Sequence, residues 1–178
     1  MPKFGTSWIP TQPEHIELFF EMCPISPSDV VYDLGSGDGR LLFAALEKGA
    51  AKCVGIEMNP ECIKIAKEAA KNLGVDDKVK FIESDFMEVD LSEASVVMCY
   101  LFPKAYTLLR SKFEKELKPG TRVIMETFPI PGWKPVKEDL RNGVSFSFYT
   151  YIMPAEKTAG YKTTINTKNP MDYNYYLL

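Results

Sequence analysis

A loop with glycines at alternate positions constrains the fold of this chain more than any other feature. The loop reads Gly35-Ser36-Gly37-Asp38-Gly39 and follows the apolar run Val30–Leu34, near whose end lies Asp33. A helical pattern of apolar residues begins directly afterwards, at Leu41. A strand, a tight glycine turn and a helix form the first unit of a doubly wound sheet, in which ligands bind beyond the carboxyl ends of the strands. The glycines allow positive φ and a close approach of the backbone to a ligand.

Two acids indicate which ligand this loop binds. Asp33 lies just before the loop, and Glu57 ends the next apolar run. An acid about 20 residues after the glycine turn is suited to ribose hydroxyls. An acid directly before the loop suits an ammonium or sulfonium group, and the G-x-G-x-G spacing differs from the dinucleotide fingerprint. The pattern therefore predicts a site for S-adenosyl-L-methionine. The loop residues expected at this cofactor are Gly35, Ser36 and Gly37.

Three further runs extend the predicted sheet: residues 79–86 and 94–101 form two strands, and the run at residues 117–126 closes a helix with Pro119-Gly120 and opens a fifth strand. Because Asp85 is an acid at the end of the first of these runs, we expect it to meet the adenine amine, with Phe86 offering its backbone amide to the ring. The fold class is α/β: a Rossmann-like, doubly wound, seven-stranded sheet that is mostly parallel, with an antiparallel C-terminal strand and helices on both faces.

The last strands of this sheet can be paired in two ways. Residues 144–152 alternate apolar and polar side chains, which is typical of a half-buried strand. Their hairpin partner is either the tail at residues 172–178 or a segment at residues 135–138. The sequence alone leaves both pairings open.

A helix is predicted before the first strand, over residues 11–23. Thr11 and Glu14 have the spacing of a capping box at its start. His15 is the only histidine in the chain, and we expect it to be solvated or packed rather than a general base.

Arg40 lies in the first turn of the helix after the glycine loop, where a cation opposes the helix dipole. We therefore expect it to pair with an acid, which could be Asp38, Asp33 or Glu57. A structural role is favoured over contact with the ligand.

The length and composition predict one globular domain. A chain of 178 residues is long enough to bury most of its apolar surface in one core. Within this domain, residues 1–26 form an N-terminal lid segment and helix, residues 27–128 the cofactor-binding core, and residues 129–178 a C-terminal hairpin and tail.

The net charge and the cysteine spacing argue against several kinds of binding partner. A net charge of −3 argues against broad nucleic-acid binding, which needs a basic surface. No pair of cysteines has the C-x-x-C spacing, so reduced buried thiols are expected and a metal site is not. Neither a membrane-spanning run nor a signal segment is visible, which predicts a cytoplasmic location.

Short runs spread over residues 8–152 carry a resemblance to a known family. They are Trp8–Thr11, Val31–Arg40, Gly55–Asn59, Val89–Ala94, Leu117–Val123 and Gly132–Pro135. The chain resembles the archaeal seven-β-strand protein lysine methyltransferases, whose eukaryotic relatives are mitochondrial lysine methyltransferases. The resemblance implies transfer of a methyl group from S-adenosyl-L-methionine to lysine side chains of a protein substrate. It also implies that Met58 belongs to the cofactor site; Thr11 is expected to be a helix cap first and a ligand contact second.

Methyl transfer to a lysine amine requires a neutral nitrogen in a water-excluding channel, where aromatic side chains also hold the methylated cation. The aromatic candidates for this channel are Trp8, Tyr100, Phe102, Phe128 and Trp133. Packing in the core is the alternative role for Tyr100 and Phe102, and packing of its loop is the alternative for Trp133. The run at residues 99–103 lacks the acid or amide of base-methylating enzymes. A small-molecule methyltransferase and a non-catalytic S-adenosyl-L-methionine-binding module remain alternative functions.

Overall fold

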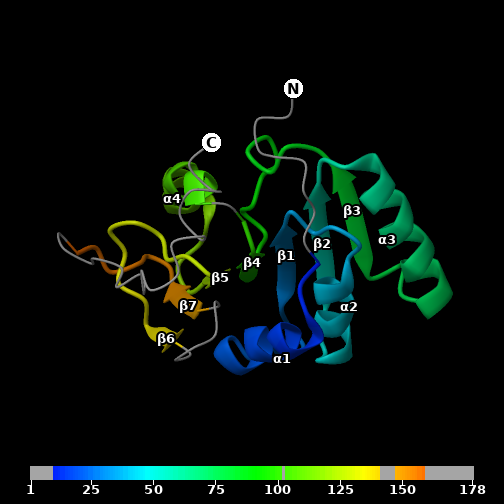
Figure 1. Cartoon of the computed structure of the whole chain (residues 1–178), viewed down its shortest axis with the longest axis horizontal. Helices are drawn as coiled ribbons and strands as arrows, with labels where there is room; N and C mark the ends of the chain where they lie inside the picture. Colours follow the sequence, from blue (N-terminus) through cyan, green and yellow to red (C-terminus); the bar gives the residue numbers. More distant parts are fainter. Residues whose placement is uncertain (1–9, 102, 141–146, 159–178) are drawn as a thin grey trace, which may run out of the picture.

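The computed structural model of this chain describes residues 10–101, 103–140 and 147–158 (Figure 1). In these ranges seven strands form one sheet, and four helices pack on it. The strands are β1 (Val30–Leu34), β2 (Lys52–Glu57), β3 (Val79–Glu83), β4 (Val96–Cys99), β5 (Arg122–Glu126), β6 (Lys137–Leu140) and β7 (Ser147–Ile152). The helices are α1 (Pro13–Met22), α2 (Arg40–Glu47), α3 (Pro60–Leu73) and α4 (Pro103–Glu116).

The strand order is β3-β2-β1-β4-β5-β7-β6. The first five strands run parallel, and β7 is antiparallel to both β5 and β6. The order reverses direction between β1 and β4, so the carboxyl ends of these two strands form the topological switch point where ligands of such sheets bind. The structure thus confirms the predicted fold class.

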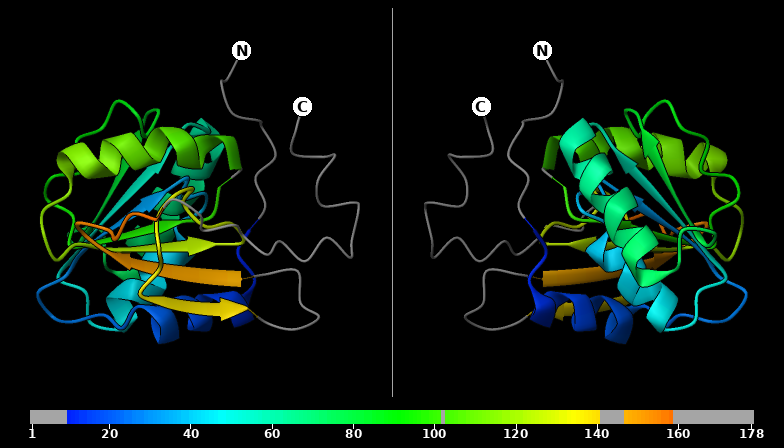
Figure 2. Two further views of the ribbon diagram at one scale, coloured as in Figure 1. Left: turned by 90° about the vertical axis from the view of Figure 1, so that its left-hand side faces the viewer. Right: turned by 90° about the vertical axis from the view of Figure 1, so that its right-hand side faces the viewer.

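Each face of the sheet carries its own apolar core, because successive side chains of a strand point to opposite faces. One core joins Val31 and Ile124 to apolar residues of α1, α2 and α3. The other joins Leu34 and Val123 to apolar residues of α4, including Phe113. The two side views place α1 and α4 on opposite sides of the sheet (Figure 2).

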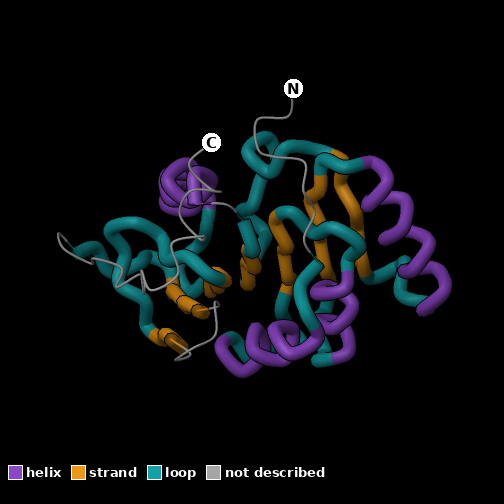
Figure 3. The backbone as a smooth tube through the Cα atoms, in the orientation of Figure 1, coloured by secondary structure: helices purple, strands orange, loops and turns teal. Residues whose placement is uncertain are grey.

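The C-terminal hairpin is formed by β6 and β7, which resolves the pairing that the sequence left open. Lys137 pairs with Thr150, and Leu140 pairs with Ser147. The segment close after Pro135 therefore supplies the partner strand, in place of the tail at residues 172–178, which lies outside the described residues. Among the described residues, no helix separates β5, β6 and β7 (Figure 3).

The predicted capping box of α1 is wrong. Gln12 is the N-cap residue, without a side-chain capping bond, and Pro13 occupies the first helical position. Proline is favoured there because its fixed φ suits the helix and its missing N–H would be unsatisfied anyway. The helix therefore starts at Pro13, and Thr11 lies before it.

Both ends of α3 are capped, since the Asn59 side chain accepts a hydrogen bond from the amide of Glu61 and Gly74 ends the helix in the left-handed conformation. All four cysteines are buried and unbridged, as expected for reduced thiols. None of the described helices combines the length and the apolar character needed to cross a bilayer.

Candidate cofactor and acceptor site

The glycine loop turns sharply at the carboxyl end of β1. Gly35, Gly37 and Gly39 all have positive φ, at 83°, 52° and 82°. The amides of Gly35 and Ser36 both donate hydrogen bonds to the carbonyl of Ile56 in β2, at 2.8 and 3.1 Å. These bonds hold the loop against the neighbouring strand.

The loop also fits closely against the middle of β2. A Cβ atom on Gly55 would lie 2.6 Å from Ser36 Oγ and 2.7 Å from the ring of Phe81. The Ser36 hydroxyl is buried and has no hydrogen-bond partner among the described residues. Glycine at position 55 is therefore required by packing under the loop, a requirement that the sequence motif did not reveal.

Glu57 ends β2 and is oriented by backbone donors. Its Oε2 accepts a hydrogen bond from the amide of Gly37 at 3.0 Å. Its Oε1 accepts from the amides of Met58 and Asn59 at 2.9 and 2.8 Å. A carboxylate has about four acceptor positions, so these three bonds leave capacity for one further donor. If two ribose hydroxyls donate to Glu57, as the sequence predicts, one of them must share an acceptor position of the carboxylate with a backbone amide.

Asp33 is buried, with 5% of its surface exposed, and its neighbours are also acidic. Burial raises the pKa of Asp33 to about 8, and the nearby charges of Glu57 and Asp38 act in the same direction. A positive group placed beside this carboxyl would compensate the burial of its charge. The site is therefore electrostatically suited to a cation such as a sulfonium or an ammonium group.

Arg40 connects the loop to the segment before α1. Its guanidinium binds the Asp38 carboxylate, with a shortest distance of 2.6 Å, which confirms one of the expected pairings. Its Nη1 also donates a hydrogen bond to the carbonyl of Thr11 at 3.1 Å. Thr11 is thereby fixed next to the glycine loop, which places it near the predicted cofactor site although it does not cap α1.

The predicted adenine contacts lie after β3. Asp85 is half-buried, and its Oδ1 accepts a hydrogen bond from the amide of Met87 at 2.9 Å. Phe86 is buried in the core on the α4 face, which makes its ring a packing group and leaves its amide as the expected ligand contact. Met58, with 40% of its surface exposed, lies just beyond Glu57.

Of the predicted channel aromatics, Tyr100 and Phe128 are half-buried and lie just beyond β4 and β5, at the carboxyl edge of the sheet. Trp8 and Phe102 lie outside the described residues. Trp133 is fully buried and packs against Phe113 and Tyr151.

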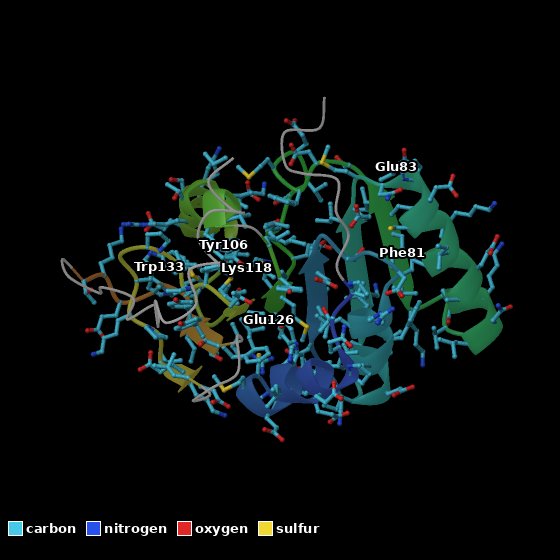
Figure 4. All side chains as sticks on the ribbon, viewed as in Figure 1. Phe81, Glu83, Tyr106, Lys118, Glu126 and Trp133 are labelled. Carbon is cyan, nitrogen blue, oxygen red and sulfur yellow. The ribbon has the colours of Figure 1, made fainter. Side chains whose placement is uncertain are left out.

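Trp133 is a packing residue, and its predicted place in the channel is not supported. Its indole nitrogen donates to Glu114 at 3.1 Å, close to the C-terminal end of α4. The helix begins at the carboxyl edge, so Glu114 lies at the opposite end of the sheet. Figure 4 places Trp133 on the α4 side, away from Glu126.

The structure brings together two titratable residues that the sequence did not connect. Glu126 ends β5 and is fully buried, and His15 Nδ1 lies 2.9 Å from its Oε1. Like Glu57, Glu126 is an acid at the carboxyl end of a parallel strand, so the signal was present in the sequence. What the sequence could not give is the contact with a helix more than 100 positions earlier.

The strand order, the alternate-glycine loop and the acids at the ends of β1 and β2 define an S-adenosyl-L-methionine-dependent methyltransferase. Residues 33–137 match the ANTKMT methyltransferase domain family. The chain therefore belongs to this family. The matched segment begins at Asp33 and contains both the glycine loop and Glu57, which are residues predicted to bind the cofactor.

Two curated relatives carry related names. A protein from Saccharolobus islandicus named protein-lysine N-methyltransferase is 38% identical over 154 residues, covering 84% of this chain and 95% of that protein. The adenine nucleotide translocase lysine N-methyltransferase of Mus musculus is 38% identical over 104 residues and covers 58% of this chain. The alignment covers 45% of the mouse protein, so this chain spans less than half of its length.

A solved structure with the same fold contains a cofactor product. It is an RNA methyltransferase from Salinibacter ruber in complex with S-adenosyl-L-homocysteine, with 37% identity and a TM-score of 0.78. The similarity covers 86% of this chain and 99% of that one. Its name specifies a different acceptor from those of the two curated relatives.

Proposed function

We propose that this chain is a protein-lysine N-methyltransferase that uses S-adenosyl-L-methionine. The observation that carries the proposal is the group of acids at the carboxyl ends of β1, β2 and β5, whose charge suits a cationic donor and a cationic acceptor. The names of the Saccharolobus and mouse relatives support lysine as the acceptor.

The cofactor is assigned to the switch point of the sheet. Glu57 is proposed to hold the ribose, Asp85 the adenine amine, and the loop residues Gly35 to Gly37 the amino-acid part near Asp33. The cofactor supplies an electrophilic methyl group on a sulfonium. The protein contributes orientation and exclusion of water. These supply much of the rate enhancement in an in-line displacement by a neutral amine.

The acceptor channel is proposed to lie above the ends of β4 and β5. Tyr100 and Phe128 are its described aromatic residues, and Trp8 and Phe102 are proposed from the sequence. Aromatic faces would hold the methylated ammonium by cation–π attraction, worth ~0.5–2 kcal/mol for each contact.

RNA methylation is the second candidate, because the Salinibacter protein is named an RNA methyltransferase. The net charge of −3 makes it the weaker candidate, since nucleic-acid affinity depends on neutralising phosphates. A small-molecule acceptor and a non-catalytic binding module complete the alternatives.

One labelling experiment separates these candidates. The protein is incubated with methyl-labelled S-adenosyl-L-methionine and a cell extract, which is then fractionated into protein, RNA and small molecules. Label in protein supports the proposal, whereas label confined to RNA or to small molecules contradicts it. Tight cofactor binding without transfer to any fraction would identify a binding module instead.

A further inference from the structure

The contact between His15 and Glu126 joins the first turn of α1 to the end of β5. His15 Nδ1 lies 2.9 Å from Glu126 Oε1. The two side chains are 11% and 0% exposed. The ring of Phe148 packs edge-on against the imidazole, with ring centroids 6.3 Å apart, and so fixes its orientation from the β7 side.

The carboxylate of Glu126 is poorly satisfied for a structural ion pair. Apart from the His15 contact, neither of its oxygens has a hydrogen-bond partner among the described residues. Burial raises the pKa of Glu126 to about 8, and the charge of Asp33 acts in the same direction. A buried carboxyl with a raised pKa and unpaired oxygens is unusual unless it serves a site.

The backbone next to Glu126 is also strained. Thr127 has a φ of 74°, which is rare for a β-branched residue. The amide of Phe128 donates to the carbonyl of Glu126 at 3.0 Å, so the chain makes a three-residue turn at this point. Within the described part of the chain, the buried Thr127 hydroxyl has no partner. Buried unpaired polar atoms and strain thus meet at one place on the carboxyl edge.

This place adjoins the proposed acceptor channel. Cys99 pairs with Met125, so the next positions along β4 and β5 are Tyr100 and Glu126. The residues just before α1 are tied to the glycine loop through the bond from Arg40 to the Thr11 carbonyl. Glu126 therefore lies at the acceptor side of the edge, and the segment just before His15 is tied to the cofactor side.

The 2.9 Å contact between His15 Nδ1 and Glu126 Oε1 favours one form of the imidazole. When Nδ1 carries the proton and donates to a carboxylate, Nε2 is the basic nitrogen of the neutral ring. A carboxylate that holds a histidine in this tautomer is the arrangement used by enzymes whose histidine removes a proton during catalysis.

We propose that His15 is the general base that deprotonates the acceptor ammonium, and that Glu126 is the positioning residue that fixes its tautomer. This inference rests on the proposed function. The N–H bond of the lysine ammonium breaks and its proton moves to His15 Nε2. The freed lone pair forms the N–CH₃ bond as the S–CH₃ bond breaks, giving S-adenosyl-L-homocysteine and a methylated ammonium. The proton on His15 then passes to solvent.

The charged groups around the imidazole come from several elements. Glu126 reaches it from β5, and the charge of Asp33 on β1 acts on Glu126. Arg40 on α2 lies near the start of α1, but its charge is paired with Asp38. On α1 itself, Glu14 adds an exposed negative charge in the first turn. The residues of β7 on this face, Phe148 and Thr150, are uncharged.

The first test compares His15→Asn with the wild type and with Glu14→Gln, an exposed control from the same helical turn. At pH 7 we expect His15→Asn to lower kcat for methylation of a lysine-rich protein by at least ~100-fold, as for loss of a general base. The Kd for S-adenosyl-L-methionine should stay within about twofold. Glu14→Gln should match the wild type.

The pH profile separates a base from a packing residue. Free lysine loses its proton near pH ~10.4, so without a base the rate should rise with the neutral amine fraction. The ratio of wild-type to His15→Asn kcat/KM should therefore fall steeply from pH 7 to pH 9. A ratio that stays constant over this range would overturn the proposal.

The second test does not depend on activity. Because His15 is the only histidine, nitrogen NMR of the whole protein reports its tautomer without ambiguity. We expect the proton on Nδ1 in the wild type and a weaker preference in Glu126→Gln. A proton on Nε2 in the wild type would overturn the assignment. Absence of methyl transfer by the wild type would instead contradict the proposed function, so the two failures are distinguishable.

Discussion

The amide of Gly37 donates a 3.0 Å hydrogen bond to Oε2 of Glu57, which links the middle of the glycine loop to the end of β2. The two residues are 20 positions apart in the sequence and form one side of the proposed cofactor site. This bond fixes the orientation of the Glu57 carboxylate. Less conformational freedom then has to be lost on binding.

Replacement of Glu57 by alanine should therefore weaken cofactor binding. The variant loses the proposed contact to the ribose, and a hydrogen bond to a charged group contributes about 1.5–3 kcal/mol. We expect Glu57→Ala to raise the Kd for S-adenosyl-L-methionine by at least ~10-fold in titration calorimetry. Glu68→Ala, an exposed position on α3, is the matched control. An unchanged Kd in Glu57→Ala would remove Glu57 from the cofactor site.

The buried carboxyl of Asp33 makes stability depend on pH. Its pKa is raised to about 8 in the folded protein, well above the ordinary value of 3.8. The native state therefore holds a proton that the unfolded state releases between these values, and the free energy of unfolding falls as pH rises through this range. Asp33→Asn should raise Tm at pH 8 without cofactor by roughly 2–4 °C for each kcal/mol recovered.

The same replacement should show little gain at pH 4, where the carboxyl is protonated in the folded wild type and about half protonated in the unfolded chain. A gain in Tm that is equal at pH 4 and pH 8 would contradict the burial argument. Circular dichroism melts of both proteins at the two pH values are sufficient for this comparison.

The close packing of β2 under the glycine loop predicts the effect of a substitution at Gly55. A Cβ at Gly55 would lie within 3.0 Å of Ser36, Phe81 and Leu42. Overpacking of this kind costs about 1–3 kcal/mol. We expect Gly55→Ala to lower the free energy of unfolding in urea by this amount and also to weaken cofactor binding, because the loop must shift.

Gly74→Ala is the control for this substitution. Gly74 has a φ of 66°, but none of the described residues has an atom within 4 Å of its added Cβ. Gly74→Ala should lower the free energy of unfolding by only about 1 kcal/mol, through backbone strain, and should leave cofactor affinity unchanged. Equal effects of the two variants on affinity would contradict the role assigned to Gly55.

The sequence predicted the positions of the proposed cofactor residues better than those of the proposed acceptor residues. Asp33, the glycine loop and Glu57 follow strands directly, and their places at the carboxyl edge are set by local chain geometry. Glu126 has the same position on β5, but its burial and its contact with His15 depend on how α1 packs, which periodicity does not determine. A loop tryptophan such as Trp133 has no visible packing partner in a sequence, which favours a channel role. The structure supplies Phe113 and Tyr151 as its partners.

Local chemistry explains the other differences from the sequence prediction. Thr11 and Glu14 have capping-box spacing, but Pro13 starts α1 one position later than that spacing requires. The hairpin partner of β7 is a short, mostly exposed edge strand, β6, and its polar residues carry little strand signal.

Trp8 remains a prediction from the sequence, since it lies outside the described residues. It precedes Pro10 and Thr11, and the latter is tied to Arg40 beside the glycine loop. We expect Trp8→Ala to lower methyl transfer to protein lysine at least severalfold, with Tm and cofactor Kd nearly unchanged. Loss of cofactor affinity in proportion to activity would place Trp8 at the cofactor and not at the acceptor.

The central claim is that the acceptor is the amine of a lysine side chain, and blocking that amine tests it most directly. A lysine-rich protein is offered as acceptor before and after chemical acetylation of its lysines, together with methyl-labelled S-adenosyl-L-methionine. The modified residues are then located by mass spectrometry. We predict that the untreated protein carries label on lysine alone and that acetylation abolishes incorporation. Label that persists after acetylation, or that is found on arginine, would contradict the account.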